Sequence, residues 1–428
     1  MSEASGRSPK VMTRGRFWVY PMYAAYGVDL YLDYALFAAF VLFAYNGGAW
    51  EAAALAVAFT APGIIVGPIL GARISRPSAT AYILMSAFVI GATSIALWLF
   101  QGAYWYILIA LIRASARLSL KIALPVLVAH RFHQREYTGA HSLLQGILNG
   151  GKILGPALAG VVLMKFGYVA LIVCSNIISV CLLASASLVH LATPTRIRRF
   201  AESGSAGAFS GGRHPITSIR LSLRALVSSN GACVGAIAFS LSTFALYISD
   251  DLLALLLKHH DFSSQDVAFS IAIIGGGGII GSLLAEPILR VVGALNLFLI
   301  AILSDTICFA VYGYAFPFVE GSLQYFLAAL TVGLMGIGVG LGAVGFGVLI
   351  QNEVPTRLIA PVTSSANAIG SALALTGPVL GAVLVDLMSV EFPFKVTAVL
   401  MGAVLLSCVF YSLKLNDTFT QNEEEAPR

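Results

Sequence analysis

The sequence carries little charge for its length. Asp, Glu, Lys and Arg together make up 11% of its 428 residues, whereas they make up about 25% of an ordinary soluble domain. Hydrophobic residues account for 58%, and the mean hydropathy is +0.88. A soluble fold with this composition would have too few polar side chains to cover its surface. The composition therefore excludes a soluble globular protein and indicates a polytopic membrane protein.

Cysteine is also scarce, and there is no sign of a cleavable leader. Residues 1–16 are basic and precede an apolar run that is too long for a signal peptide and lacks an A-x-A-like site, so we expect a retained cytoplasmic tail. The cysteines lie in apolar runs without C-x-x-C spacing, which excludes a disulfide framework and a zinc site. We therefore expect no metal, no cofactor and buried free thiols at Cys174, Cys181, Cys233, Cys308 and Cys408.

Windows of about 20 apolar residues predict an all-α membrane protein with twelve transmembrane helices. The predicted spans are 17–45, 51–72, 79–100, 104–129, 139–164, 168–192, 230–257, 265–288, 293–316, 322–350, 361–388 and 394–414. If the N-terminus is cytoplasmic, eighteen of the 25 Lys and Arg residues lie on that side and three on the outer side. This positive-inside bias predicts that both termini are cytoplasmic, and we expect a multi-pass protein of the inner membrane.

One long polar interruption divides the predicted spans six and six. Residues 193–229 are rich in Ser, Gly and Arg and end in a basic amphipathic stretch, which we expect to form a helix on the inner leaflet. They separate a first six-helix half, 17–192, from a second, 230–414. The acidic end of the chain, 415–428, has few apolar residues and is predicted to be disordered.

The two halves repeat each other in sequence. Three features of the first half recur in the second at offsets of 214 to 222 residues: Glu51 with Asp266, Gly67 with Gly281, and Gly155-Pro156 with Gly377-Pro378. A repeat of this kind predicts two pseudo-symmetric halves. Two six-helix halves are typical of alternating-access transporters, whose site lies near the bilayer midplane.

Two stretches carry a resemblance to a known family. The loop after the second predicted span reads GPILGARISR, with Gly67, Leu70, Arg73 and Arg76, and its copy GSLLAEPILR has Gly281 and Arg290. This pattern resembles the G-x-L-a-D-R-x-G-R loop of the major facilitator superfamily, although Ala72 stands where the family has an acid. The resemblance extends over nearly the whole chain and implies the major facilitator fold.

The resemblance also implies a branch and a residue role. Gly155-Pro156 with Gly160 resembles the span-5 signature associated with export, so the chain looks similar to the bacterial efflux branch of enterobactin exporters and macrolide pumps. Arg113 occupies the position of an arginine in span 4 of the family, and that arginine is linked to proton coupling. Arg117 replaces a glycine of that motif and adds a charge.

Charged residues inside the predicted spans are the main functional signal. Span 4 contains Arg113, Arg117 and Lys121 at i, i+4 and i+8, so that all three project from one helix face. Span 1 contains Asp29 and Asp33 at i, i+4. A charge near the bilayer centre costs from ~3 to more than ~10 kcal/mol, so these groups line a wet cavity or pair with one another. Lys121 lies nearer the cytoplasm and is expected to snorkel.

Span 5 adds a polar stripe. Gln145, Asn149 and Lys152 follow at i, i+4 and i+7, and Asn367 in span 11 aligns with Gln145 at the 222-residue offset. Two readings remain open at this point. The two aspartates could neutralise the two arginines as structural ion pairs, or the surplus positive charge could bind substrate. We favour the second reading, with substrate-binding residues Arg113, Arg117, Lys152, Gln145, Asn149 and Asn367, and proton coupling by Asp29, Asp33 and Arg113.

Other polar and glycine patterns carry weaker expectations. Asp250 and Asp251 are expected at a solvated vestibule edge, whereas Asp305 in span 9 is as consistent with a structural role as with a functional one. Gly340–Gly345 matches G-x-G-x-x-G, but it lies in an apolar span without a βαβ context, so it does not predict nucleotide binding.

Together these features predict a proton-coupled exporter of a small organic anion or carboxylate such as a siderophore, drug or metabolite. We expect a monomer whose partners are its substrate, protons and membrane lipids, without nucleic acid. The first alternative is a proton symporter that imports an anionic metabolite or siderophore. The second is a polytopic membrane enzyme or receptor, which the absence of a nucleophile–base pair or metal-ligand cluster disfavours.

Overall fold

The computed structural model describes residues 17–67, 69–70, 74, 79–131, 137–192, 230–353 and 356–424. Throughout these residues the regular structure is helical, without a strand. The chain divides into two compact units. The first comprises Met1–Gly212 and Leu257–Ala272, and the second comprises Arg213–Leu256 and Ile273–Arg428. The division follows the predicted halves except that residues 257–272 pack with the first unit. The predicted tail 1–16 and linker 193–229 lie outside the described residues.

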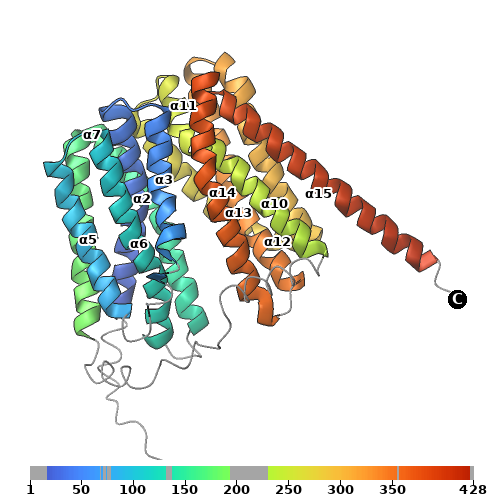
Figure 1. Cartoon of the computed structure of the whole chain (residues 1–428), viewed down its shortest axis with the longest axis horizontal. Helices are drawn as coiled ribbons and strands as arrows, with labels where there is room; N and C mark the ends of the chain where they lie inside the picture. The colour runs from blue at the N-terminus through green and yellow to red at the C-terminus, as the bar shows by residue number, and fades with distance from the viewer. Residues whose placement is uncertain are drawn as a thin grey trace, which may run out of the picture. The chain divides into compact units, whose positions relative to one another are not determined.

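The helices of the first unit form a bundle in which α2 packs mainly against α7, and α6 packs against α3 and α5 (Figure 1). They are α2 (Val19–Ala38), which continues as the π-helix η1 (Ala39–Ala44), α3 (Ala49–Ile65), α5 (Ala79–Leu99), α6 (Ala103–Arg131) and α7 (Tyr137–Leu191). Within α7 the backbone is non-helical at Gly167, where φ is 76°. Glycine adopts this left-handed conformation without steric cost, and Gly167 lies in the predicted turn between spans 5 and 6.

In the second unit α10 packs against α13, α14 and α15. Its elements are α10 (Asn230–Ser249), η2 (Asp250–Leu252), α11 (Leu253–His259), α12 (Ser264–Ala310), η3 (Val311–Ala315), η4 (Phe316–Phe318), α13 (Gly321–Glu353), α14 (Thr356–Leu387) and α15 (Phe392–Glu424). The C-terminal end of α11, from Leu257, and the start of α12, up to Ala272, belong to the first unit. Within α12 the chain turns at Gly293, with φ 80°. The predicted disorder of 415–428 is not observed up to Glu424, because helix α15 propagates into it; extending an existing helix is easier than nucleating one.

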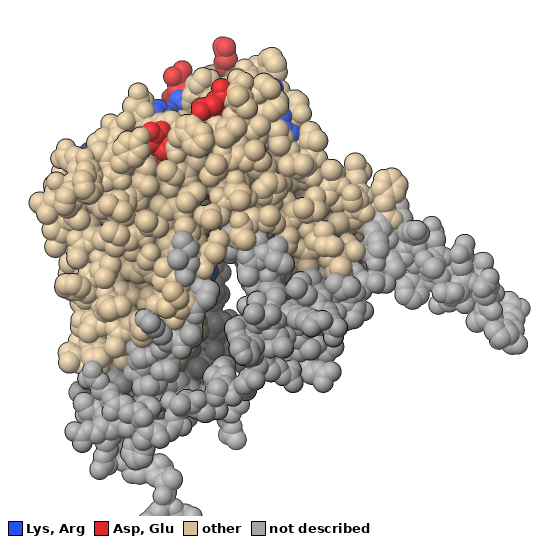
Figure 2. Space-filling model, viewed as in Figure 1, with Lys and Arg blue, Asp and Glu red and all other residues tan. Residues whose placement is uncertain are grey.

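Seven of the described helical stretches are long and apolar enough to cross a bilayer, which supports a multi-pass membrane protein. Figure 2 shows the visible described surface almost free of charged side chains except near one end, as expected for a surface that faces lipid. The five cysteines are free. The prediction that all are buried is wrong for Cys181, which is exposed, because an apolar side chain of a membrane protein can face lipid as well as the core.

The repeated Gly-Pro motif has the same packing role in both units. A Cβ added to Gly155 of α7 would lie 2.6 Å from the backbone N of Leu32 in α2, and one added to Gly377 of α14 would lie 2.7 Å from the backbone C of Tyr247 in α10. Each glycine therefore allows close approach to the first helix of its own unit.

The other predicted motif residues differ in their packing. Gly281 permits a close approach of α12 to α13, since a Cβ there would lie 2.2 Å from the Ile337 carbonyl oxygen. A Cβ on Gly67 would make only an ordinary contact, 3.8 Å from Leu118. Arg290 is exposed and pairs with Glu286 at 2.5 Å. Arg73 and Arg76 lie outside the described residues. Gly340 and Gly345 lie inside the continuous helix α13, which is not the setting of a nucleotide-binding loop.

Candidate functional site

Four charged side chains meet inside the first unit. Asp29 and Asp33 come from α2, and Arg113 and Arg117 come from α6. The i, i+4 spacing within each helix places both members of a pair on one face, and the two faces are turned toward each other. The exposed fraction is 0% for Asp29, Asp33 and Arg113 and 3% for Arg117. We call these four residues the Asp–Arg cluster.

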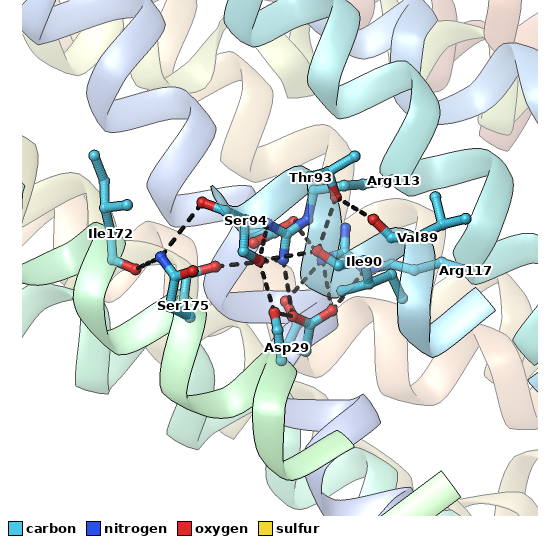
Figure 3. Close-up of polar contacts among 12 residues, drawn as sticks. Asp29, Val89, Ile90, Thr93, Ser94, Arg113, Arg117, Ile172 and Ser175 are labelled. Atoms are coloured by element: carbon cyan, nitrogen blue, oxygen red, sulfur yellow. Dashed lines mark hydrogen bonds and ion pairs between the residues drawn. The ribbon is translucent and has the colours of Figure 1, made fainter. Parts of the chain in front are cut away.

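Asp29 is the most strongly held member of the Asp–Arg cluster (Figure 3). Its Oδ1 accepts from Arg113 Nη2 at 2.9 Å, and its Oδ2 accepts from Arg117 Nε at 3.0 Å and Nη2 at 2.7 Å. The backbone carbonyl of Asp29 also accepts from Arg117 Nη2 at 3.2 Å. A carboxylate that bridges two guanidinium groups in this way receives several charge-assisted hydrogen bonds, the strongest class in proteins.

Asp33 is held less completely. Its Oδ2 accepts a hydrogen bond from Arg117 Nη2. The same oxygen lies 2.6 Å from Arg113 Nε, where it forms an ion pair but not a hydrogen bond, because the N–H group does not point at it. Its Oδ1 is buried and receives no hydrogen bond from any described residue. The Asp–Arg cluster is therefore electrically balanced but unevenly bonded, and Asp33 accepts fewer hydrogen bonds than Asp29.

Serine side chains from two further helices complete the surroundings. Arg113 donates from Nη1 to Ser94 of α5 at 3.0 Å and from Nη2 to Ser175 of α7 at 3.3 Å. Ser94 Oγ lies 2.8 Å from Ser179 Oγ, which in turn contacts Asp29 Oδ1 at 3.4 Å. Sequence reasoning missed these serines. The available signal was the i, i+4 spacing of Ser175 and Ser179 in an apolar span.

This geometry favours the ion-pair reading of the four residues. Two carboxylates balance two guanidinium groups, and the exposed fractions leave no surface of Arg113 for a ligand in this conformation. The surplus positive charge that the sequence predicted in this half must therefore reside on its lysines. Lys121 is exposed on α6, which leaves Lys152 as the candidate that is partly enclosed.

Lys152 is a half-buried cation without a neutralising acid among the described residues. Its Nζ lies 5.9 Å from the centre of the Tyr31 ring of α2, within cation–π range. The close approach of α7 to α2 at Gly155 brings the two side chains together. Asn149, one turn earlier on α7, is also half-buried. The side chains of Gln145 and Asn367 are outside the described part of the structure.

An aromatic row continues from Lys152 along α2. The ring centres of Tyr31 and Tyr34 are 6.3 Å apart, and those of Tyr34 and Phe59 of α3 are 4.5 Å apart. Tyr34 is 37% exposed. Neither ring was predicted as part of the site, although Tyr31 and Tyr34 have the i, i+3 spacing that places residues on one helix face. A cation beside an accessible aromatic row suits a ligand that has both an anionic group and an apolar body.

The carboxylates of the second unit are partly enclosed. Asp250 and Asp251 are half-buried in η2, and Asp251 Oδ2 is fully enclosed, so the expectation of a solvated edge is wrong for Asp251. Asp305 of α12 is half-buried, with an enclosed Oδ1.

The sequence pattern of the Major Facilitator Superfamily matches residues 19–376. The chain belongs to the Major Facilitator Superfamily. Superfamily members are transporters of small molecules, so the chain is a multi-pass membrane transporter and not an enzyme. The part of the resemblance that concerned the superfamily is confirmed. A comparison with curated protein sequences gives no match.

Solved transporter structures share this fold. A mutant of the nucleoside transporter NupG is similar with a TM-score of 0.73 and 11% identity, over 93% of this chain and 99% of that one. The peptide transporter POT, as a mutant in complex with alafosfalin, gives 0.68 and 15% identity over 93% of each chain. A bacterial homologue of the iron transporter ferroportin in its inward-facing state gives 0.65 and 13%, over 95% of this chain and all of that one. At these identities the likeness concerns the fold alone.

Proposed function

We propose that the chain is a proton-coupled exporter of a small organic anion and that it works by alternating access in the inner membrane. The observation that carries the choice of an anion is Lys152, a half-buried cation of the first unit without a neutralising acid among the described residues. A charge in that position is costly. A bound anion would remove the cost during part of the transport cycle, which gives the protein an affinity for anionic cargo.

Twelve spans in two six-helix halves remain part of the proposal. The glycines at 167 and 293, with positive φ, interrupt α7 and α12, so each of these helices is long enough to supply two spans. The shorter apolar helices Ala49–Ile64 and Ala372–Leu387 supply two more, and α6, with 29 residues, supplies the twelfth. Cytoplasmic termini and a monomer complete this architecture.

Lys152 is the proposed anchor for the anionic group of the substrate. Asn149 adds a hydrogen-bonding group one turn away, and Gln145 and Asn367 are proposed as further polar contacts from the same stripe and its counterpart in the second half. Arg113 and Arg117 were expected to contact the substrate directly. Their enclosure in the Asp–Arg cluster supports an indirect role instead, in which they hold the coupling acid until the conformation changes.

Asp33 is the proposed proton acceptor of the Asp–Arg cluster. Asp29 accepts three hydrogen bonds from the two guanidinium groups, whereas Asp33 accepts one and has an unpartnered Oδ1. Protonation of Asp33 therefore breaks fewer bonds than protonation of Asp29. It would also leave a net positive charge on the cluster, which would loosen α2 from α6 and favour a different arrangement of the helices.

Export rests on the Gly155-Pro156 motif, which resembles the span-5 signature of the efflux branch. Import of an anion together with protons is the alternative, and it uses the same residues. The solved relatives do not choose between them, because nucleosides, peptides and iron are named as their cargoes. Uptake into everted membrane vesicles under an imposed pH gradient separates the two: an exporter accumulates its substrate inside such vesicles when their interior is acidic.

Purified protein in proteoliposomes tests the function. A set of membrane-impermeant organic anions, such as 4-sulfobenzoate and citrate, is screened for saturable counterflow. We expect Lys152→Gln to raise KM strongly, and Lys165→Gln, which changes an exposed lysine of the same helix, to leave KM unchanged. Equal behaviour of the two variants would contradict the assignment of Lys152. If the wild-type protein shows saturable flux with none of these anions, the proposal of an anionic substrate is contradicted.

A further inference from the structure

The aromatic row of Tyr31, Tyr34 and Phe59 is packed against buried rings. The ring centres of Tyr34 and Phe59 are 4.5 Å apart, and that of Phe59 lies 6.0 Å from the ring centre of Phe37. Phe37 is fully buried, and its ring centre lies 6.1 Å from that of Tyr106 of α6, which is 1% exposed. Because buried rings of α2 and α6 hold the row from behind, its rings are in place before a ligand binds.

The front of the row is accessible. Tyr34 is 37% exposed, and Tyr31 and Phe59 are half-buried. Lys152 Nζ lies 5.9 Å from the centre of the Tyr31 ring. A cation in contact with lipid tails is costly, so the side of the bundle where Lys152 and these rings lie faces water rather than lipid. The exposed ring surface is therefore within reach of a dissolved ligand.

A glycine leaves open space next to the row. Gly63 follows Phe59 by four residues on α3, so both lie on one side of that helix. It is exposed, and a Cβ added to it would meet nothing within 4 Å. Tyr34 of α2 contacts Phe59 of α3, and the two helices run antiparallel because a short turn joins them. One turn back along α2 is Tyr31, which therefore lies at the level of Gly63 and its open space.

A flat ring suits this surface better than an aliphatic group of equal size. The planes of Tyr31 and Tyr34 are inclined by 32°, and those of Tyr34 and Phe59 by 40°, so the rings share a similar orientation. Aromatic side chains attract a further ring in offset-stacked or edge-to-face geometry, in addition to the gain from buried apolar area. A ring in the space at Gly63 can meet these side chains while its acidic substituent meets the ammonium group of Lys152.

We propose that the cargo is an aromatic anion, whose ring occupies the space beside Tyr31, Tyr34 and Phe59. Lys152 binds its sulfonate or carboxylate group, and Gly63 is the residue that admits the ring. This inference rests on the proposed function in taking Lys152 as the anchor of an anionic substrate. It narrows the substrate class from organic anions in general to those that carry a planar ring next to the acidic group.

Three sulfonates separate recognition of an aromatic ring from recognition of any apolar group. Benzenesulfonate and cyclohexanesulfonate have the same charge and nearly the same size, whereas ethanesulfonate lacks a ring, and all three stay ionised. Titration calorimetry of the purified protein in detergent gives their Kd values. The wild-type protein should bind benzenesulfonate about 2- to 10-fold more tightly than cyclohexanesulfonate, as expected for one aromatic pair. Equal affinities, or no binding of benzenesulfonate, would overturn the proposal.

Matched variants locate the ring of the ligand. Tyr34→Leu and Phe59→Leu keep an apolar side chain but remove the aromatic face, so each should bring the ratio of the two Kd values closer to one. Gly63→Leu should weaken binding of benzenesulfonate more than that of ethanesulfonate, because it fills the open space. Gly91→Leu of α5, where a Cβ also meets nothing within 4 Å, should change neither value. A preference for the aromatic ring that persists in all three site variants would contradict the assignment.

Counterflow of the same sulfonates in proteoliposomes distinguishes this inference from the proposed function. Saturable flux of ethanesulfonate that is lost in Lys152→Gln, without a preference for the aromatic ring, leaves the anion transporter standing and rejects the aromatic site. Binding of benzenesulfonate that depends on Tyr34 and Phe59, without flux of any sulfonate, supports the aromatic site and rejects the proposed function.

Discussion

Asp29 and Asp33 lie four residues apart on one helix, yet the structure predicts that they contribute unequally to the free energy of unfolding. In Asp29→Asn, the variant loses the carboxylate that bridges both guanidinium groups, and a donor NH2 group faces the donors of Arg113 and Arg117. Removing one partner of a buried ion pair typically costs about 3–5 kcal/mol. We expect Asp29→Asn to fall in that range.

Asp33→Asn should destabilise the protein less than Asp29→Asn does. Asp33 accepts one hydrogen bond from the guanidinium groups where Asp29 accepts three, and its Oδ1 has room for an unbonded group. A hydrogen bond to a charged group contributes about 1.5–3 kcal/mol. Because asparagine keeps one acceptor oxygen, Asp33→Asn can retain its bond whereas Asp29→Asn loses at least one. The free energy of unfolding of Asp33→Asn should therefore exceed that of Asp29→Asn by at least one such bond.

A double variant tests the electrical balance itself. Asp29→Asn combined with Arg117→Gln leaves Asp33 and Arg113 as a neutral pair whose Oδ2 and Nε are 2.6 Å apart. Because the second change removes the uncompensated charge, the combined loss should be smaller than the sum of the single losses by about 1–3 kcal/mol.

These differences are measurable by denaturant unfolding in detergent micelles, followed by circular dichroism, with equal m values as the condition for comparison. The reasoning is refuted if Asp33→Asn is at least as destabilising as Asp29→Asn, or if the double variant is strictly additive. The second result would mean that the four charges act independently.

Further variants test the packing of α7 and the recognition site beside it. Gly155→Val should lower Tm and abolish transport because the backbone of Leu32 occupies the space, whereas Gly150→Val, with nothing within 4 Å of its Cβ, should fold normally. Tyr34→Ala should weaken binding of 4-sulfobenzoate more than that of citrate, as measured by counterflow KM, since only the aromatic anion can stack on the ring; equal losses would exclude an aromatic contact. Lys258→Gln should lower Tm because its Nζ donates to the Leu42 carbonyl and, at 2.7 Å, to Asn46 Oδ1; an unchanged Tm would show that these bonds add nothing.

Much of the fold could be predicted because it depends on local periodicity. Apolar runs of bilayer length predicted the long apolar helices, and the loop motifs with their 214–222-residue repeat indicated the superfamily. The repeated Gly155 and Gly377 also marked equivalent close approaches, since only glycine permits the backbone contacts at both places. The exposed Cys181 was predicted incorrectly because hydropathy does not distinguish a side chain that faces lipid from one that faces the core.

The site could be predicted only in part. The i, i+4 spacing of Asp29 with Asp33 and of Arg113 with Arg117 placed each pair on a helix face. It left open whether the two faces neutralise each other or line a substrate site, because the rotation of α2 against α6 is set by tertiary packing. The serines of α5 and α7 and the ring of Tyr31 beside Lys152 come from separate helices for the same reason. The enclosure of Asp251 depends on the η2 break, which hydropathy does not register.

The most direct test of the account is proton movement that depends on the cargo. Protein is reconstituted with a pH-sensitive dye inside the liposomes, and the organic anion that gives counterflow is added outside without a pH gradient. The account predicts anion-dependent proton flux in the direction opposite to the anion, reduced in Asp33→Asn and unaffected in Lys165→Gln. Anion flux that moves no protons, or moves them equally well in Asp33→Asn, would contradict proton coupling through the Asp–Arg cluster.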